Sequence, residues 1–248
     1  MKLDRVIAVR NSKTVYRDGD RCVKVFNSEY SKADVLNEAL NQARIEQTGI
    51  NVPEILEVTT FDNKWAIASK FIKGKTLSLL MKENESKISE YLELLVDMQI
   101  DVHQKTMPLL NNLKDRLRRR IIRSELNATK RYQLCSRLEN MPRHNKICHG
   151  DFIPSNIMVA EDGKAYILDW SHVSAGNASA DAASTYLSFC LNGQDDLADK
   201  YLDLFCQKSG TSKEYVKKWI PIVAASLSVS SNENTRQKLL DYANEEGE

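Results

Sequence analysis

The stretch from His149 to Trp170, HGDFIPSNIMVAEDGKAYILDW, decides the fold of this chain. It contains two short apolar runs, residues 157–159 and residues 165–168. Asp162-Gly163 lies between them, and an Asp-Gly pair flanked by apolar runs is a strong signal for a β-hairpin. The sequence therefore predicts a hairpin whose strands are these two runs.

Three polar residues lie just outside the predicted strands. Asp151 and Asn156 precede the first strand, and Asp169 follows the second. Because a hairpin brings its open ends together, we expect Asn156 and Asp169 at the same end. An Asp followed five residues later by an Asn, and then an Asp after the next strand, is the pattern of a kinase catalytic loop and its metal-binding carboxylate. Phosphoryl transfer needs one carboxylate to orient the attacking hydroxyl and two oxygen ligands to hold Mg²⁺.

These motifs, His149-Gly150-Asp151 with Asn156 and Ile167-Leu168-Asp169, resemble the aminoglycoside phosphotransferase and choline kinase superfamily. The resemblance implies an α+β, bilobal protein-kinase-like fold with a small antiparallel-sheet N-lobe and a larger, mostly helical C-lobe. It implies an ATP-dependent (or GTP-dependent) kinase that uses Mg²⁺ and phosphorylates a hydroxyl of a small molecule. The acceptor is expected to be aminoglycoside-, choline- or sugar-like.

The resemblance also implies a role for each polar residue. Asp151 is the expected catalytic base, and Asn156 and Asp169 are the expected metal ligands. Asp181 matches the family's carboxylate after the metal-binding strand, which braces the catalytic loop, and His149 is expected to order the same loop.

Two other functions stay open from the sequence. The first is a metal-dependent hydrolase that uses His149, Asp151, Asp169 and His172 as ligands, since these residue types bind Zn²⁺ or Mn²⁺. The second is a nucleotide-binding protein without catalytic activity. The hydrolase leaves Asn156 and the amino-terminal half without a function, so the kinase is the favoured interpretation.

The amino-terminal part offers a phosphate-binding pair. Lys24 lies in the apolar strand pattern of residues 21–26, and Glu38 lies in a helical pattern over residues 32–48. In kinases a strand lysine holds the nucleotide phosphates and a helix glutamate positions it. We therefore expect Lys24 to pair with Glu38, with Glu46 as the second choice.

The lobe boundary is predicted near residue 72, giving a nucleotide-binding lobe (1–72) and a catalytic and acceptor-binding lobe (73–248). The resemblance places the adenine near Lys70 and Ile72. A glycine-rich phosphate loop is missing, since the first glycine of the chain is Gly19. The phosphate-covering loop is instead expected near Arg10-Asn11-Ser12-Lys13-Thr14, where either the backbone amides or the Ser12 hydroxyl reaches the phosphates.

Helices are predicted for most of the rest of the chain. Residues 113–135 form a strongly basic helical pattern, which we interpret as a solvated face. Residues 213–228 are predicted as a single helix as well.

The formal net charge is +1, which indicates neither nucleic acid nor a membrane surface as a partner. The five cysteines are scattered without a CxxC pair, as is typical of a reduced cytoplasmic protein. We expect a cytoplasmic enzyme, monomeric or homodimeric, whose partner is the small-molecule acceptor.

Overall fold

In the computed structural model, which describes residues 5–9 and 12–245, the amino-terminal part forms an antiparallel five-stranded sheet of order β1-β2-β3-β5-β4. Its strands are β1 (Arg5–Val9), β2 (Lys13–Asp18), β3 (Arg21–Phe26), β4 (Ile55–Phe61) and β5 (Lys64–Lys70). Turn chemistry sets the hairpins: Gly19 follows β2 with φ of 60°, and Asp62 and Asn63 join β4 to β5 with φ of 49° and 58°. Consecutive left-handed residues match the right-handed twist of the strands they connect.

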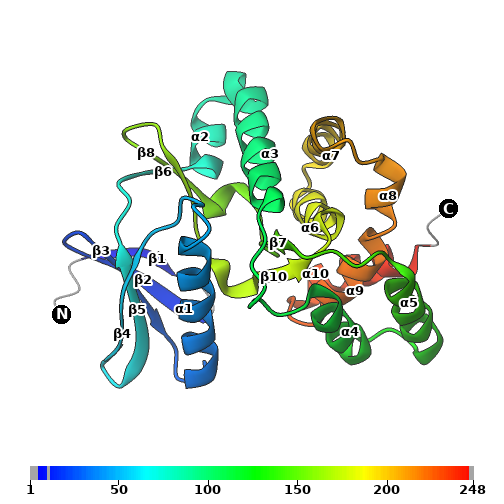
Figure 1. Cartoon of the computed structure of the whole chain (residues 1–248), viewed down its shortest axis with the longest axis horizontal. Coiled ribbons are helices and arrows are strands. Elements are labelled where there is room, and N and C mark those ends of the chain that lie inside the picture. Colours follow the sequence, from blue (N-terminus) through cyan, green and yellow to red (C-terminus); the bar gives the residue numbers. More distant parts are fainter. Residues whose placement is uncertain (1–4, 10–11, 246–248) are drawn as a thin grey trace. The chain divides into compact units, whose positions relative to one another are not determined.

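Helix α1 (Lys32–Glu46) packs along this sheet, as Figure 1 shows. Ser31 caps its start, because the Ser31 side chain accepts a hydrogen bond from the backbone N–H of Asp34. Val35 and Ala39 lie one turn apart on the face that meets Phe26 and Ile67 of the sheet. This apolar contact fixes which helix residues face the sheet.

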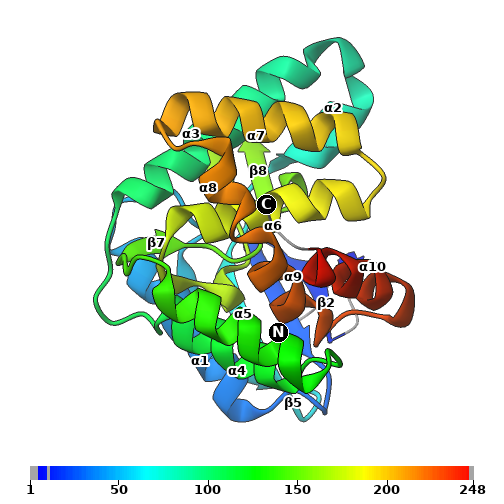
Figure 2. The same cartoon turned by 90° about the vertical axis from the view of Figure 1, so that its right-hand side faces the viewer.

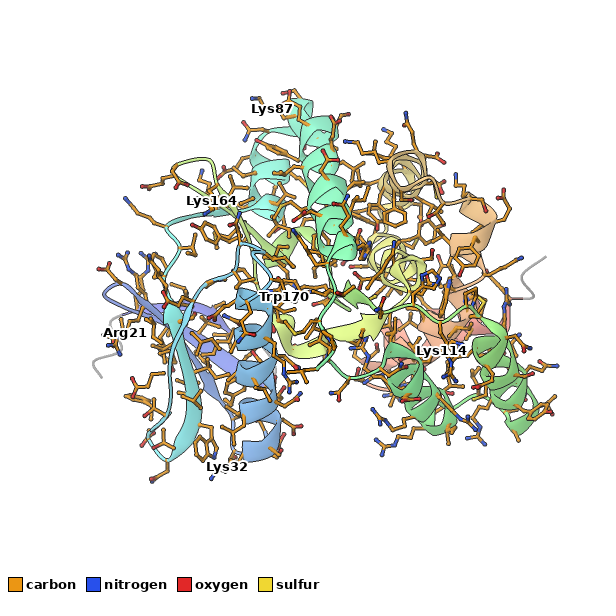
Figure 3. All side chains as sticks on the ribbon, in the orientation of Figure 1. Arg21, Lys32, Lys87, Lys114, Lys164 and Trp170 are labelled. Atoms are coloured by element: carbon orange, nitrogen blue, oxygen red, sulfur yellow. The ribbon has the colours of Figure 1, made fainter. Side chains whose placement is uncertain are left out.

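The predicted hairpin is present. Strands β8 (Ile157–Ala160) and β9 (Ala165–Ile167) pair in antiparallel register, and β8 also pairs with β6 (Gly74–Thr76), which leads into α2 (Leu77–Glu83). A short 3₁₀ turn precedes β8 (η2, Pro154–Asn156) and another follows β9 (η3, Trp170–His172). Trp170, labelled in Figure 3, is fully buried in η3, which packs against α1.

Because β8 pairs with β6, the hairpin belongs to the same compact unit as the five-stranded sheet. This first unit is Met1–Glu85 with Pro154–His172, and the second unit is Ser86–Ile153 with Val173–Glu248. The observed units therefore differ from a simple division at residue 72.

The second unit is mainly helical, with a two-stranded sheet of β7 (Lys146–Cys148) and β10 (Ser174–Gly176). Large buried aromatic side chains, among them Trp219, Tyr201 and Phe205, fill its core. Its helices, several of which are visible in Figure 2, are α3 (Ile88–Gln104), α4 (Leu113–Arg123), α5 (Ala128–Asn140), α6 (Ala178–Leu191), α7 (Asp195–Ser209), α8 (Lys213–Lys217), α9 (Ile220–Ser228) and α10 (Glu233–Asn244), preceded by the 3₁₀ turn η1 (Glu85–Lys87).

The single helix predicted for residues 113–135 was wrong, because two helices, α4 and α5, are present. Ser124 ends the first helix by donating its hydroxyl to the carbonyl of Ile121, and Asn127 caps the second by accepting the N–H of Lys130. Lys114, labelled in Figure 3, links the pair: its ammonium donates to the carbonyl oxygens of Glu139 and Met141 near the end of α5.

Residues 213–228 also form two helices instead of one. The break falls at Lys218 and Trp219, and Pro221 lies in the first turn of the second helix, where its missing N–H costs no helical hydrogen bond. Within the described residues, no helix combines the length and the apolar character needed to cross a membrane.

Candidate functional site

Lys24 and Glu38 form an ion pair in the first unit. Lys24 lies between Val23 and Val25 on β3, and its ammonium donates to a carboxylate oxygen of Glu38 at 2.8 Å. Glu38 lies on α1 with only 2% of its surface exposed. Glu46, the second choice from the sequence, instead accepts the backbone N–H of Ile55 at 2.8 Å. The structure thus brings Lys24 together with Glu38.

The charge state of Lys24 follows from its surroundings. Burial by itself would lower the pKa of the ammonium group. The neighbouring carboxylates of Asp169 and Glu38 outweigh burial and raise the pKa of Lys24 above its ordinary value. Lys24 therefore stays positively charged at neutral pH, as a phosphate-binding group must.

The open end of the β8–β9 hairpin brings Asn156 and Asp169 together. The backbone N–H of Leu168 donates to the carbonyl of Asn156 at 2.8 Å, which closes the hairpin immediately before Asp169. Asp169 has a φ of 62°, a left-handed conformation that is uncommon for a residue other than glycine. Such conformations often mark functional sites.

Lys13 lies within the expected phosphate loop, but the sequence reasoning gave its side chain no role. Its ammonium donates to both carboxylate oxygens of Asp169, at 3.0 and 2.9 Å. The same nitrogen lies 3.6 Å from a carboxylate oxygen of Glu38. The signal was present in the strand alternation: Val15 pairs with Lys24 across β2 and β3, and Lys13 lies two residues from Val15 on the same face.

Lys13, Lys24, Asn156 and Asp169 line one cavity of about 340 Å³. That volume is within the usual range of small-molecule sites, roughly 300–1,000 Å³. Lys70 and Ile72 lie on its wall, whereas Ser12 is not among the described lining residues, and its backbone carbonyl accepts the N–H of Asn27 at 2.9 Å. Arg10 and Asn11, the residues just before Ser12, fall outside the described part of the chain. The other lining residues include Ile7, Ala8, Val15, Cys22, Gln42, Pro53, Ser69, Phe71, Gly74, Thr76, Ser155, Met158 and Leu168.

The polar lining fits a magnesium nucleotide. Mg²⁺ prefers oxygen ligands and is usually held by one or two carboxylates together with substrate phosphates. Asp169 supplies the carboxylate and Asn156 an amide oxygen on the cavity wall. The lysine ammonium against both oxygens of Asp169 shows that a cation is accommodated there. The apolar part of the wall, which includes Ala8, Val15 and Met158, suits a nucleobase.

In the second unit, Asp181 holds the loop that contains Asp151. The Asp181 carboxylate accepts the backbone N–H groups of His149 at 3.2 Å and Gly150 at 2.6 Å. His103 lies with Nε2 at 3.0 Å from the same carboxylate. Burial would raise the pKa of Asp181, but the interactions with His103, His149 and Gly150 outweigh burial and lower it.

The loop is also held on the other side of Asp151. Thr185, one turn after Asp181 on α6, donates its hydroxyl to the carbonyl of Phe152 at 2.9 Å. The ring nitrogen Nδ1 of His149 accepts the backbone N–H of Asp151 at 3.2 Å. Helix α6 thus fixes the backbone on both sides of Asp151, and His149 orders the loop from within. Sequence reasoning did not identify Thr185, whose spacing from Asp181 was the available signal.

Among the described residues, no group of three or more His, Cys, Asp or Glu side chains is arranged to hold a metal ion.

The fold is similar to those of solved aminoglycoside phosphotransferase and choline kinase structures. The aminoglycoside phosphotransferase APH(4)-Ia, as a thermostable mutant, superposes with a TM-score of 0.71 at 13% identity, covering 96% of this chain and 91% of that chain. A choline/ethanolamine kinase family protein from Mesorhizobium loti gives 0.66 at 14% identity, covering 97% and 86%. Choline kinase LicA from Streptococcus pneumoniae gives 0.62 at 14% identity, covering 98% and 92%.

At these identities the structural neighbours establish the fold, which confirms the predicted kinase-like α+β architecture. A comparison with curated protein sequences found no significant match. The model of the phosphotransferase enzyme family matches residues 5–215, most of the sequence. The chain therefore belongs to the phosphotransferase enzyme family.

Proposed function

We propose that this protein is a small-molecule kinase that transfers the γ-phosphoryl group of ATP, or GTP, to a hydroxyl. The observation that carries the proposal is the convergence of Lys24, Asn156 and Asp169 at one cavity, with Lys24 held by Glu38. Membership in the phosphotransferase family supports the same reaction.

The first unit binds the nucleotide in this proposal. Lys24, positioned by Glu38, holds phosphate oxygens, while Asn156 and Asp169 hold Mg²⁺. The metal, when bound, neutralises negative charge on the phosphates during transfer. The backbone between Lys70 and Ile72 hydrogen-bonds the base, a role that their position on the cavity wall supports.

The second unit supplies the catalytic base. Asp151 orients the acceptor hydroxyl and takes its proton as the oxygen attacks the γ-phosphorus. The bond from the γ-phosphorus to the β–γ bridging oxygen breaks, and the nucleoside diphosphate leaves. The hydrogen bonds from the loop to Asp181 and Thr185 hold the backbone on both sides of Asp151, so little ordering of the loop is needed at the moment of reaction.

The acceptor class is drawn from the relatives. Solved structures of APH(4)-Ia hold hygromycin B with ADP or with AMP-PNP, and LicA is a choline kinase. We accordingly propose an aminoglycoside-, choline- or sugar-like alcohol as the acceptor of this chain.

Thermal unfolding with Mg²⁺ and ATP or GTP tests nucleotide binding. A ligand that binds only the native state increases the free energy of unfolding, by about 2.7 kcal/mol at a hundredfold excess of ligand over Kd, and so raises the melting temperature. We expect such a shift for the wild type and its loss in Asp169→Asn. Asp162→Asn, in the exposed hairpin turn, is the matched control and should keep the shift. A wild-type protein that does not respond to either magnesium nucleotide would contradict the proposal.

Turnover separates a kinase from a non-catalytic nucleotide-binding protein. With a panel of hydroxylated amines and sugars, the wild type should convert ATP to ADP in an acceptor-dependent manner. Asp151→Asn should keep nucleotide binding and lose turnover by at least about a hundredfold. If Asp151→Asn keeps full turnover, Asp151 is not the base.

A further inference from the structure

Two lysines, not one, face the carboxylates of the nucleotide cavity. Lys13 lies at the start of β2 with 11% of its side chain exposed, and Lys24 lies on β3 with 18% exposed. The Lys13 ammonium is 2.9 Å from Asp169, and that of Lys24 is 3.5 Å from it. Both side chains line the cavity together with Asp169.

The sheet register fixes this placement. Lys13 pairs with Phe26 across β2 and β3, and Val15 pairs with Lys24. Residues that pair across an antiparallel ladder point to the same face, as do residues two apart on one strand. Lys13 and Lys24 therefore lie diagonally on one face, and the placement of Lys13 follows from backbone pairing.

Each lysine of this cluster has a carboxylate partner in the structure. Lys24 lies closest to Glu38, at 2.8 Å, and Lys13 lies closest to Asp169. When Asp169 becomes a magnesium ligand, Lys13 keeps only the carboxylate of Glu38, which is 3.6 Å away and already pairs with Lys24 at 2.8 Å. A partly buried ammonium needs another anion nearby, and the phosphates of a magnesium nucleotide supply one.

The amino-terminal sequence lacks the glycine-rich loop that would otherwise contact the phosphates, which leaves a role for a second lysine. Phosphates in kinases are usually covered by a glycine-rich loop whose backbone can approach closely. The first glycine of this chain is Gly19, which lies after β2. A long cationic side chain reaches a phosphate from β2 without a close approach of the backbone.

We propose that Lys13 is a second phosphate-binding residue, which leaves Asp169 when magnesium binds there and then contacts the β- or γ-phosphate of the nucleotide. This inference rests on the proposed function, since it assigns a role within the same nucleotide site.

The test compares the affinities of adenosine, AMP, Mg-ADP and Mg-ATP for the wild type and Lys13→Met by calorimetry. The substitution should weaken the binding of Mg-ADP and of Mg-ATP by about tenfold to a hundredfold, the range expected for the loss of one charge-assisted hydrogen bond. Adenosine and AMP should bind with unchanged affinity, because they lack the distal phosphates. Lys13→Arg should restore most of the affinity for Mg-ATP.

Lys73→Met is the matched control, since Lys73 belongs to the same unit but is exposed and pairs with Glu161. It should bind all four ligands like the wild type. If Lys13→Met binds adenosine and Mg-ATP more weakly by the same factor, the proposal is overturned in favour of a structural role for Lys13. Unchanged or tighter Mg-ATP binding would overturn it in favour of a simple counter-ion for Asp169. If the wild type binds Mg-ATP and only the Lys13 prediction fails, the proposed kinase function stands; if the wild type binds no nucleotide, both fail.

Discussion

Asp181 shows how a single buried carboxylate organises the candidate catalytic loop. It is 2% exposed, accepts two backbone N–H groups of the loop and contacts His103. A buried carboxylate is costly unless it is hydrogen-bonded or paired with a cation. Here several donors converge on it, so the ionised form is favoured despite burial. The same bonds that stabilise the charge also fix the loop, which joins stability to function at one residue.

The lowered pKa of Asp181 gives a pH prediction. Since the native-state pKa lies below the ordinary value of 3.8, the native protein binds fewer protons than the unfolded chain. Its contribution to stability is therefore present above the ordinary value and is lost as the pH falls through the native-state pKa. Urea unfolding in the acid range should show a shallower loss of stability in Asp181→Asn than in the wild type. Asp162→Asn should match the wild type, and equal slopes in all three proteins would contradict this role.

Helix α6 is the element that connects the fold of the second unit to the candidate catalytic loop. Asp181 and Thr185 are one helical turn apart, so their side chains project from the same face. One bonds the loop before Asp151 and the other after it. Gln99 of α3 donates to Thr185 at 3.1 Å, and Tyr201 of α7 donates to Gln99 at 2.5 Å, which extends the network to neighbouring helices.

Thr185→Val tests this element. The substitution keeps the side-chain shape but leaves the buried carbonyl of Phe152 without the Thr185 hydroxyl, which should cost about 1–3 kcal/mol of unfolding free energy. We expect kcat to fall while the Kd for Mg-ATP stays unchanged, because the nucleotide cavity lies in the other unit. Thr185→Ser should rescue kcat. A Thr185→Val enzyme with wild-type kcat would show that the loop does not depend on this bond.

Strand β6 depends on a glycine. A Cβ added at Gly74 would lie 2.1 Å from the carbonyl oxygen of Val159 on β8, closer than any side chain can approach. Because the obstacle is backbone, Gly74→Ala should disturb the pairing of β6 with β8 and cost about 3 kcal/mol. Gly19→Ala, where open space surrounds the added atom but φ is 60°, should cost about 1 kcal/mol. The midpoints of urea unfolding measure the loss of stability in each variant. A smaller loss for Gly74→Ala than for Gly19→Ala would contradict this account.

At the scale of the whole molecule, the proposed functions divide between two units. The cavity proposed to bind the nucleotide is lined by described residues of the first unit. Asp151 and the groups that brace its loop belong to the second unit. The chain passes from Ile153 of the second unit to Pro154 of the first, so the proposed base and the hairpin proposed to bind the metal are connected by a few residues of sequence.

Hydrogen exchange tests this division. Mg-ATP should slow amide exchange in β2, β3, β8 and β9, whose residues contribute to or adjoin the cavity wall. Since Asp151 lies outside the cavity lining, Asp151→Asn should show the same protection by Mg-ATP as the wild type, whereas Asp169→Asn should lose it. Protection confined to the second unit would contradict the location of the nucleotide site.

The sequence by itself determined the local features: the β8–β9 hairpin, the open end that joins Asn156 to Asp169, and the strand and helix that carry Lys24 and Glu38. These follow from turn residues and from periodicity, which depend on neighbours a few positions away. Only the tertiary structure decided that Lys13 contacts Asp169, that the hairpin joins the sheet-containing unit, and that Thr185 bonds the loop. Each of these contacts joins residues far apart in sequence. The break in residues 113–135 depends on the side chains of Ser124 and Asn127, whose bonds to the backbone compete closely with helix continuation. The break in residues 213–228 falls just before Pro221. Strand alternation indicates the face on which Lys13 lies, and helical spacing relates Thr185 to Asp181. Strand register and packing then decide which distant group each side chain contacts.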